Sequence, residues 1–406
     1  GVYAPMFALF QSAGKSLRTF RLPILAPILA FGLAACDPAA FTGFGGQSDN
    51  GPKIDRNAPV SVALLVPRGS GSASDDLLAQ SLENAARLAI RDMGGVRIDL
   101  RVYDTAGDAQ TAATQATQAV SDGAKIILGP VYAGAANAAA VAVAGKNVNI
   151  IAFSNNPTIA GGNLFVLGQT FQNTANRMVS YAKSQGKDRI VVAHAQDVAG
   201  QLGGNAVKAA IAANGATLAG SVEYLLSQQG VVAAIPRIKA AVGNGGANAV
   251  FMTSPSASAL PLLTQLLPEA GVNPRVTQFI GLTRWDIPAT TLDLPGVQAG
   301  WFAVPDPAAT SAFRSQYNAA YGMAPHPIGG LAFDGMAAVG ALLKSGKSNA
   351  LSANAITQGA GFKGAGGVFR FLQDGTNERA LAIATIRDKK MVMIDNAPTG
   401  FRGAGF

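Results

Sequence analysis

The residues that could do chemistry in this chain are few and widely spaced. It holds two histidines and one cysteine; His194 ends an apolar run and His326 lies between two prolines. Neither histidine stands at a metal-ligand spacing or beside a nucleophile motif, which favours a buried or turn role for both. The stretch 340–348 has five residues between its glycines where a phosphate loop needs four. We therefore predict that the protein is not an enzyme and uses neither a cofactor nor a metal.

Residues that could instead bind a ligand follow four apolar runs. They are Gly129-Pro130 with Tyr132, Ser154-Asn155, Asp197 and Ser254. Parallel strands bring such loops to one edge of an open sheet, where α/β proteins bind their ligands. The first two sets also precede predicted helices, whose first N–H groups attract an anion. Turns and helix caps explain each residue equally well when it is taken alone, but together they predict a ligand-binding cleft.

Residues 1–35 have the order of parts of a secretory signal. A basic stretch leads into an apolar run at 22–33, which is too short for a permanent membrane span. The run ends in Leu-Ala-Ala-Cys, which resembles a bacterial lipobox with Cys36 as the lipidated residue. The stretch 36–57 is rich in Gly, Asp and Pro and predicts a flexible tether. We expect a periplasmic protein with a lipid anchor in a cell-envelope membrane, and Asp37 favours the inner membrane.

The net charge of +8 looks at first like a signal for nucleic acid. Lys15, Arg18 and Arg21 lie in the predicted leader, so its removal leaves +5, which is 8 minus 3. The other basic residues are dispersed singly and form no basic run with interleaved aromatics. We expect no nucleic-acid partner.

The elements that must position these loops are strands alternating with helices. A first set of strands is expected at 60–66, 98–103, 125–128 and 148–153, and a second set at 189–193, 217–224, 248–253 and 276–281. The pattern predicts an α/β fold with two doubly wound parallel-sheet lobes joined by a hinge. Lobe I is assigned to 58–170 and 284–345, and lobe II to 171–283 and 346–406. The alternating stretch 364–394 predicts a terminal β-meander.

The sequence resembles the type 1 periplasmic binding proteins, in particular the leucine/isoleucine/valine-binding family that serves ABC transporters. The resemblance covers nearly all of the chain after Asn57, and its matching segments are 62–67, 127–131, 150–156, 294–297 and 331–334. It implies that the Gly129-Pro130 loop and the Ser154 loop hold a ligand carboxylate. It also implies an amino-acid-like ligand, an ABC permease as partner and closure of the two lobes around the ligand.

Two departures from that family bear on the site. Its amino-acid binders place a serine in the loop after Gly129-Pro130, where this chain has Ala133 and Gly134. They also use tyrosine and acidic groups of the second lobe for the ammonium group, whereas the stretches 197–200 and 254–256 offer only Asp197.

These departures keep a second hypothesis open. Lipoproteins that activate penicillin-binding proteins have a similar fold, a lipobox and often a degenerate cleft, so the partner could be a penicillin-binding protein.

Trp285 could line the cleft or pack in a core, and the sequence supports both roles.

Overall fold

The computed structural model describes residues 51–401. The predicted leader, Cys36, Asp37 and the tether up to residue 50 lie outside the described residues. Within the described range, no helix combines the length and the apolar character that crossing a bilayer requires.

The first sheet has five strands in the order β2-β1-β3-β4-β5, and every neighbouring pair is parallel. Its strands are β1 (Val60–Val66), β2 (Ile98–Asp104), β3 (Ile126–Leu128), β4 (Asn149–Ala152) and β5 (Leu164–Val166). Strands β1, β3 and β4 carry almost only apolar residues because helices cover both faces of the sheet. Strands β1 to β4 confirm the first predicted set of strands.

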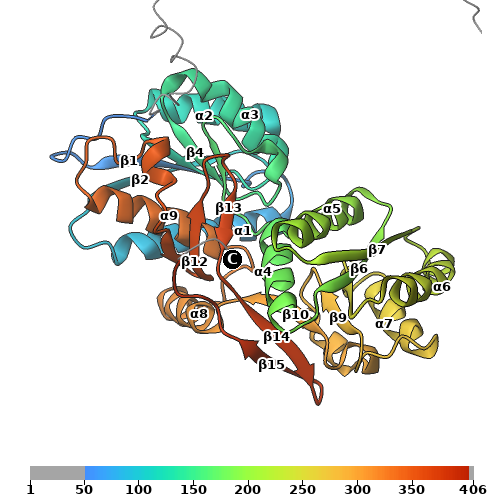
Figure 1. The fold of residues 1–406 in the computed structure, drawn as a ribbon. Helices are drawn as coiled ribbons and strands as arrows, with labels where there is room; N and C mark the ends of the chain where they lie inside the picture. The colour runs from blue at the N-terminus through green and yellow to red at the C-terminus, as the bar shows by residue number, and fades with distance from the viewer. Residues whose placement is uncertain (1–50, 402–406) are drawn as a thin grey trace, which may run out of the picture. The chain divides into compact units, whose positions relative to one another are not determined.

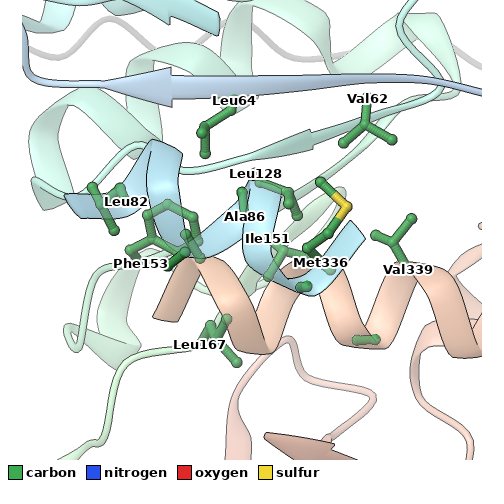
Figure 2. Packing of buried hydrophobic residues seen from close by; sticks show 14 of the residues in the cluster. Val62, Leu64, Leu82, Ala86, Leu128, Ile151, Phe153, Leu167, Met336 and Val339 are labelled. Carbon is green, nitrogen blue, oxygen red and sulfur yellow. The ribbon is translucent and has the colours of Figure 1, made fainter. Parts of the chain in front are cut away.

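Alternate residues of β1 pack into two different cores on opposite faces of the sheet. Figure 1 shows α9 (Gly330–Lys344) on one face of this sheet and α2 (Ala109–Ser121) and α3 (Ala133–Val143) on the other. Val62 and Leu64 join a cluster with α1 (Ala73–Arg91), α8 (Pro307–Tyr321) and α9, and Figure 2 shows them pointing toward Met336 and Val339. Ala63 joins the opposite cluster with α2 and α3. Helices α8 and α9 therefore return to the first lobe, as predicted.

The second sheet has seven strands in the order β15-β14-β10-β9-β8-β6-β7. Its parallel strands are β6 (Arg189–Ala195), β7 (Thr217–Tyr224), β8 (Ala249–Met252), β9 (Gln278–Gly281) and β10 (Trp301–Pro305). The edge is completed by the antiparallel strands β14 (Leu381–Arg387) and β15 (Lys390–Asp395). Four helices belong to this lobe: α4 (Phe171–Ser184), α5 (Val198–Ala213), α6 (Gln228–Gly245) and α7 (Leu260–Glu269). The two-lobed α/β fold predicted from the sequence is confirmed.

A third, three-stranded antiparallel sheet is formed by the part of the chain between β10 and β14. It consists of β11 (Phe362–Gly364), β12 (Gly367–Phe371) and β13 (Asn377–Arg379), and it follows the short helix α10 (Ala353–Ile356). Phe362, Phe369 and Phe371 are buried in the core of the first lobe. The predicted terminal meander is therefore two separate antiparallel units, because β14 leaves the small sheet to pair with β10.

The structure corrects the predicted lobe boundaries at three places. Strand β10, predicted to lie in lobe I with 284–345, belongs to the second sheet because it pairs with β9 and β14. Segment 351–371, predicted for lobe II, packs in the first core through its apolar side chains. Residues 51–57 of the predicted tether are not a free linker: the N–H of Ile54 donates to the Ser348 carbonyl at 2.8 Å and its side chain packs against the first core.

The chain crosses between the lobes near 167–170, 305–307 and 380. At the first crossing, Thr170 and Asn173 form a reciprocal capping box that starts α4. Nearby, the amide of Asn377 donates to the carbonyls of Val166 at 2.8 Å and Gly168 at 3.0 Å. The Asn173 amide donates in turn to the Asn377 carbonyl at 2.7 Å. These bonds tie two crossings to each other.

Candidate functional site

The loop after β3 is shaped by Gly129. Its φ is +82°, and a Cβ at this position would lie 2.3 Å from the Leu65 carbonyl oxygen. The N–H of Gly129 donates to the Ile151 carbonyl at 2.8 Å, and the Pro130 carbonyl accepts from the N–H of Phe153 at 2.9 Å. The loop is thus fixed between β1 and β4, and it delivers the chain into α3.

Helix α3 begins directly after Tyr132, which makes no side-chain capping bond. The Tyr132 hydroxyl instead donates to the Asp75 carboxylate of α1 at 2.5 Å, although 41% of the residue is exposed. This bond, followed by partial burial, raises the pKa of Tyr132 above its ordinary value. The N–H groups in the first turn of α3 therefore have no side-chain capping partner, and the Tyr132 side chain is bonded to α1 instead.

Ser154 follows β4 at the same edge of the first sheet. It is only 5% exposed, and its Oγ accepts from the N–H of Asn156 at 3.1 Å. Its carbonyl accepts from the N–H of Gly168 at 3.0 Å, so the loop is braced against the first crossing. Asn155 is exposed. Of the five predicted ligand-binding residues in this lobe, only Tyr132 and Asn155 are exposed.

In the second lobe, Asp197 caps α5. Its Oδ1 accepts from the N–H of Gly200 at 2.9 Å, and the residue is exposed. Ser254 is 3% exposed, and its Oγ lies 2.5 Å from the hydroxyl of Tyr224. Burial raises the pKa of Tyr224, and the Asp197 charge raises it further. Ser254 therefore contacts Tyr224, and Gln196, the residue before Asp197, donates its N–H to the Tyr224 carbonyl at 2.9 Å.

Tyr224 was missed in the sequence. It is the last residue of β7, and its place at the carboxyl end of a predicted strand was the available signal. The stretches 197–200 and 254–256 lack a tyrosine, and Tyr224 supplies one from the neighbouring strand.

A cavity of about 220 Å³ opens elsewhere in the molecule. It lies beside α8 and α9, with Arg284, Arg314 and Arg379 among its lining residues. None of the seven predicted ligand-binding residues lines it. The three arginines come from segments far apart in the sequence, so no local sequence motif predicted that they would line one cavity.

The structure also places three residues that were discussed from the sequence: Trp285, His194 and His326. Trp285 is fully buried in the core of the second lobe and stacks on Phe302 with ring centroids 6.2 Å apart, so it packs and does not line a cleft. His194 is also buried, with Nδ1 3.1 Å from the Ala195 carbonyl oxygen. His326 lines the cavity, and burial lowers its pKa.

Asp334 and Arg379 form a buried ion pair at the edge of this cavity. Arg379 Nη1 lies 3.1 Å from Asp334 Oδ2, and the Asp334 Oδ1 accepts from the N–H of Ala365 at 2.6 Å. Burial raises the pKa of Asp334 above its ordinary value, against the opposing effect of Arg379. No three metal-binding side chains gather anywhere in residues 51–401.

Comparison with known proteins gives consistent relatives. The structure is similar to a protein of Rhodospirillum rubrum named as a candidate branched-chain amino acid ABC transporter, with a TM-score of 0.69, 17% identity, and coverage of 83% of this chain and 100% of that one. A branched-chain amino acid ABC transporter periplasmic ligand-binding protein of Burkholderia xenovorans LB400 gives a TM-score of 0.64 at 18% identity, covering 84% and 96%. An ABC transporter substrate-binding protein of Desulfitobacterium hafniense, in complex with Leu, gives 0.58 at 17%, covering 83% and 100%.

Among curated proteins, an uncharacterised protein of Rickettsia prowazekii (strain Madrid E) is 26% identical over 129 residues. The match spans 32% of this chain and about a third, 34%, of that protein's length. The family model described as "Periplasmic binding protein" matches residues 59–390, which is most of the chain. The chain therefore belongs to the periplasmic binding protein family.

Proposed function

We propose that the chain is the lipid-anchored, periplasmic solute-binding component of an ABC transporter and that it binds a small amino-acid-like ligand. The observation that carries the proposal is the pair of polar loop sets at the carboxyl ends of parallel strands, one in each sheet. Open α/β sheets bind ligands at this edge. The leucine complex of the Desulfitobacterium hafniense protein supports an aliphatic amino acid as the first ligand to test.

In this proposal the first lobe binds the ligand carboxylate. The uncapped N–H groups at the start of α3 and the Ser154 hydroxyl are the donors, and the helix dipole adds about 0.3–1 kcal/mol of attraction for an anion. Ala133 and Gly134 provide no hydroxyl at this point, so main-chain donors carry more of the binding.

The second lobe then closes on the ligand. Asp197 supplies the negative charge for an ammonium group, and Ser254 and Tyr224 supply hydroxyls beside it. Closure requires backbone rotation only at the crossings, since each lobe has its own core. A ligand stabilises the closed form by its greater affinity for that form.

Replacing Ser154 tests the first-lobe contact. With a panel of aliphatic amino acids as probes, Ser154→Ala is expected to weaken binding about tenfold, because one hydrogen bond to a charged group is lost. Calorimetry measures the affinity, and thermal unfolding shows that the variant is folded. Ser184→Ala, which removes an exposed hydroxyl from α4, is the matched control. Unchanged affinity in Ser154→Ala would remove this loop from the site.

Metabolic labelling tests the anchor. Labelled palmitate should be incorporated into the wild-type protein and lost in Cys36→Ala. Equal labelling of the two proteins would exclude Cys36 as the lipidated residue.

A second candidate function is activation of a penicillin-binding protein. Two observations favour it: the Tyr132 hydroxyl already binds Asp75, and the Ser254 hydroxyl already binds Tyr224, so both loop sets are partly satisfied within their own lobes. Such an activator would bind its synthase through one lobe. A pull-down from membrane extracts that recovers a peptidoglycan synthase, without any thermal shift from amino acids, would support this function over transport.

A further inference from the structure

A second cavity, of about 390 Å³, lies at the base of the first lobe, where the amino ends of β1 and β2 meet. It is lined by the segment before β1, the turn between α1 and β2, and the end of α9. Four of the lining residues are basic: Arg56, Arg97, Lys344 and Lys347. Asp55 is the only acidic residue among the described residues that line it, so the lining carries a net charge of +3, four minus one.

The four basic side chains keep their charges unneutralised. All four are exposed, and none of them forms an ion pair with an acidic side chain of residues 51–401. Asp55 accepts from the N–H of Asn57 at 2.8 Å, and Arg97 donates to the neutral Asn57 carbonyl. A cleft lined by charges of one sign concentrates ions of the opposite sign. The cavity therefore favours an anionic occupant.

Apolar side chains share the lining with these charges. They are Ile54, Val60, Val96 and Leu343. Val60 is buried, and the other three pack against the core of the first lobe. An occupant that matches the whole lining offers an anionic group beside an apolar part. An anionic phospholipid does so, because its phosphate lies next to its acyl chains.

The proposed lipid anchor would bring this base to a membrane. Residues 37–50 are the fourteen residues between Cys36 and Gly51, and they can span at most roughly 50 Å. Arg56, only five residues after Gly51, already lines the cavity. The segment that joins the folded lobe to the proposed anchor is therefore part of the cationic surface.

We propose that the base of the first lobe docks on the surface of an anionic phospholipid bilayer, with the four basic residues binding the lipid phosphates. The base lies at the amino ends of the parallel strands, whereas the Gly129 and Ser154 loops follow their carboxyl ends. Docking thus leaves these loops at the far end of the lobe, away from the bilayer. The proposal rests on the proposed lipid anchor for the approach to the membrane, but the lipid contact itself does not require it.

Vesicles of two compositions test the lipid contact. The chain from residue 37 onward contains both hydrophobic cores and lacks Cys36, so no anchor contributes to its binding. In co-sedimentation it should bind vesicles of equal parts phosphatidylcholine and phosphatidylglycerol at least about tenfold more tightly than phosphatidylcholine vesicles. About 1 M sodium chloride should release it, because the Debye length falls to about 3 Å. Equal binding to the two compositions, or binding to neither, overturns the proposal.

Neutralising the base tests the location. The triple variant Arg56→Gln, Lys344→Gln and Lys347→Gln should weaken binding to the anionic vesicles on the order of a hundredfold, at about fivefold per residue. Arg97 is retained in this variant because it bonds the turn before β2 to the segment before β1. Thermal unfolding shows that the variant is folded.

A second triple variant removes the same charge from the other lobe. Lys239→Gln, Arg275→Gln and Lys390→Gln replace exposed basic residues that do not line the cavity. This control should bind the anionic vesicles nearly like the unmutated chain. If both triple variants bind alike, net charge and not the base drives the binding, and the proposal fails.

Inorganic phosphate distinguishes a free anion from a lipid surface. At a phosphate concentration equal to that of the vesicle lipid, it should not displace the protein from the anionic vesicles, because a bilayer presents many phosphates to the four basic residues at once. Displacement under these conditions, together with phosphate binding that the base triple variant loses, would assign the cavity to a soluble anion and reject membrane docking.

The outcome is separable from the proposed transport function. Palmitate labelling of Cys36 and amino-acid binding that depends on Ser154, without any preference for anionic vesicles, would leave the receptor function standing and reject the docking surface. A preference for anionic vesicles that the base triple variant loses, without palmitate labelling, would support the surface and reject the anchor. Amino-acid binding should be the same in the base triple variant and in the unmutated chain.

Discussion

At the scale of single residues, the first-lobe site is held by a conformation that glycine adopts readily and other residues do not. Gly129 has a φ of +82°, and a methyl group at its Cα would meet the Leu65 carbonyl oxygen at 2.3 Å. Five residues later, Gly134 lies in the first turn of α3 with no atom within 4 Å of a built Cβ. The two glycines serve opposite purposes: one is required by sterics and the other leaves the helix start open.

Alanine at each position separates these two roles. Gly129→Ala should lower the free energy of unfolding by more than about 2 kcal/mol, because the new Cβ clashes with backbone and the φ is strained. Gly134→Ala should be neutral or stabilising by up to about 1 kcal/mol, since alanine is the better helix former. Denaturant titration measures both. Equal effects of the two substitutions would show that the loop after β3 is not constrained as described.

At the scale of elements, α9 is joined to β13 by the buried pair of Asp334 and Arg379. The side chains are 2% and 9% exposed, and the guanidinium also lies over the Phe369 ring at 5.2 Å from its centroid. Such a pair adds little net stability compared with apolar residues of the same shape, but breaking it strands a charge.

Replacing Arg379 tests how much this ion pair contributes to stability. Arg379→Ala should lower the free energy of unfolding at neutral pH by about 3–5 kcal/mol, because Asp334 remains buried without a counter-charge. Arg101→Ala, which breaks an exposed pair with Asp99, should change it little and serves as the control.

The same variant should have a characteristic pH dependence. Burial raises the pKa of Asp334 above its ordinary value of 3.8, and loss of Arg379 removes the effect that opposes this. Between the unfolded and folded pKa values the native state binds more protons, so stability falls as pH rises. Arg379→Ala should therefore regain part of its lost stability as pH is lowered toward 3.8, as measured by denaturant titration across pH. A pH-independent loss would show that packing, and not the stranded charge, is the cause.

At the scale of the whole molecule, Asn377 links the crossings on which any lobe movement depends. It is buried, it donates to Val166 and Gly168 at the first crossing, and it accepts from Asn173 at the start of α4. The bonds join β13 to a segment about two hundred residues earlier in the chain. These hydrogen bonds contribute to the connection between the two lobes.

Replacing this residue should loosen the connection without disturbing either sheet. Asn377→Ala leaves two carbonyls without their donor, at a cost of about 1–3 kcal/mol each if they stay dry. Amide hydrogen exchange at Gly168 and Thr170 should become faster, while amides inside β1 and β8 keep their protection. Asn214→Ala, which removes a similar amide bond at the end of α5, should leave the exchange at both crossing amides unchanged.

The sequence by itself determined the alternation of strands and helices, the parallel strands of the two large sheets and the loops at the carboxyl ends of those strands. These properties are encoded locally, in apolar runs, periodicity and turn residues, so the strand sets at 60–153 and 189–281 lie close to their predicted positions. It also offered Asp197 after β6 and Ser254 after β8; β6 pairs with both β8 and β7, and Tyr224 ends β7. The ligand role of these loops stays a prediction.

Only the tertiary structure decided which sheet β10 joins, where 351–371 packs, and which residues line the cavity beside α8. Each depends on contacts between segments far apart in the chain: β14 covers the edge of β10, and Arg284, Arg314 and Arg379 meet from a loop, a helix and a strand. A local sequence pattern indicates how a segment folds and which of its faces is buried, but it does not identify the distant segment that covers that face. That segment is determined by packing and hydrogen bonding in the folded chain.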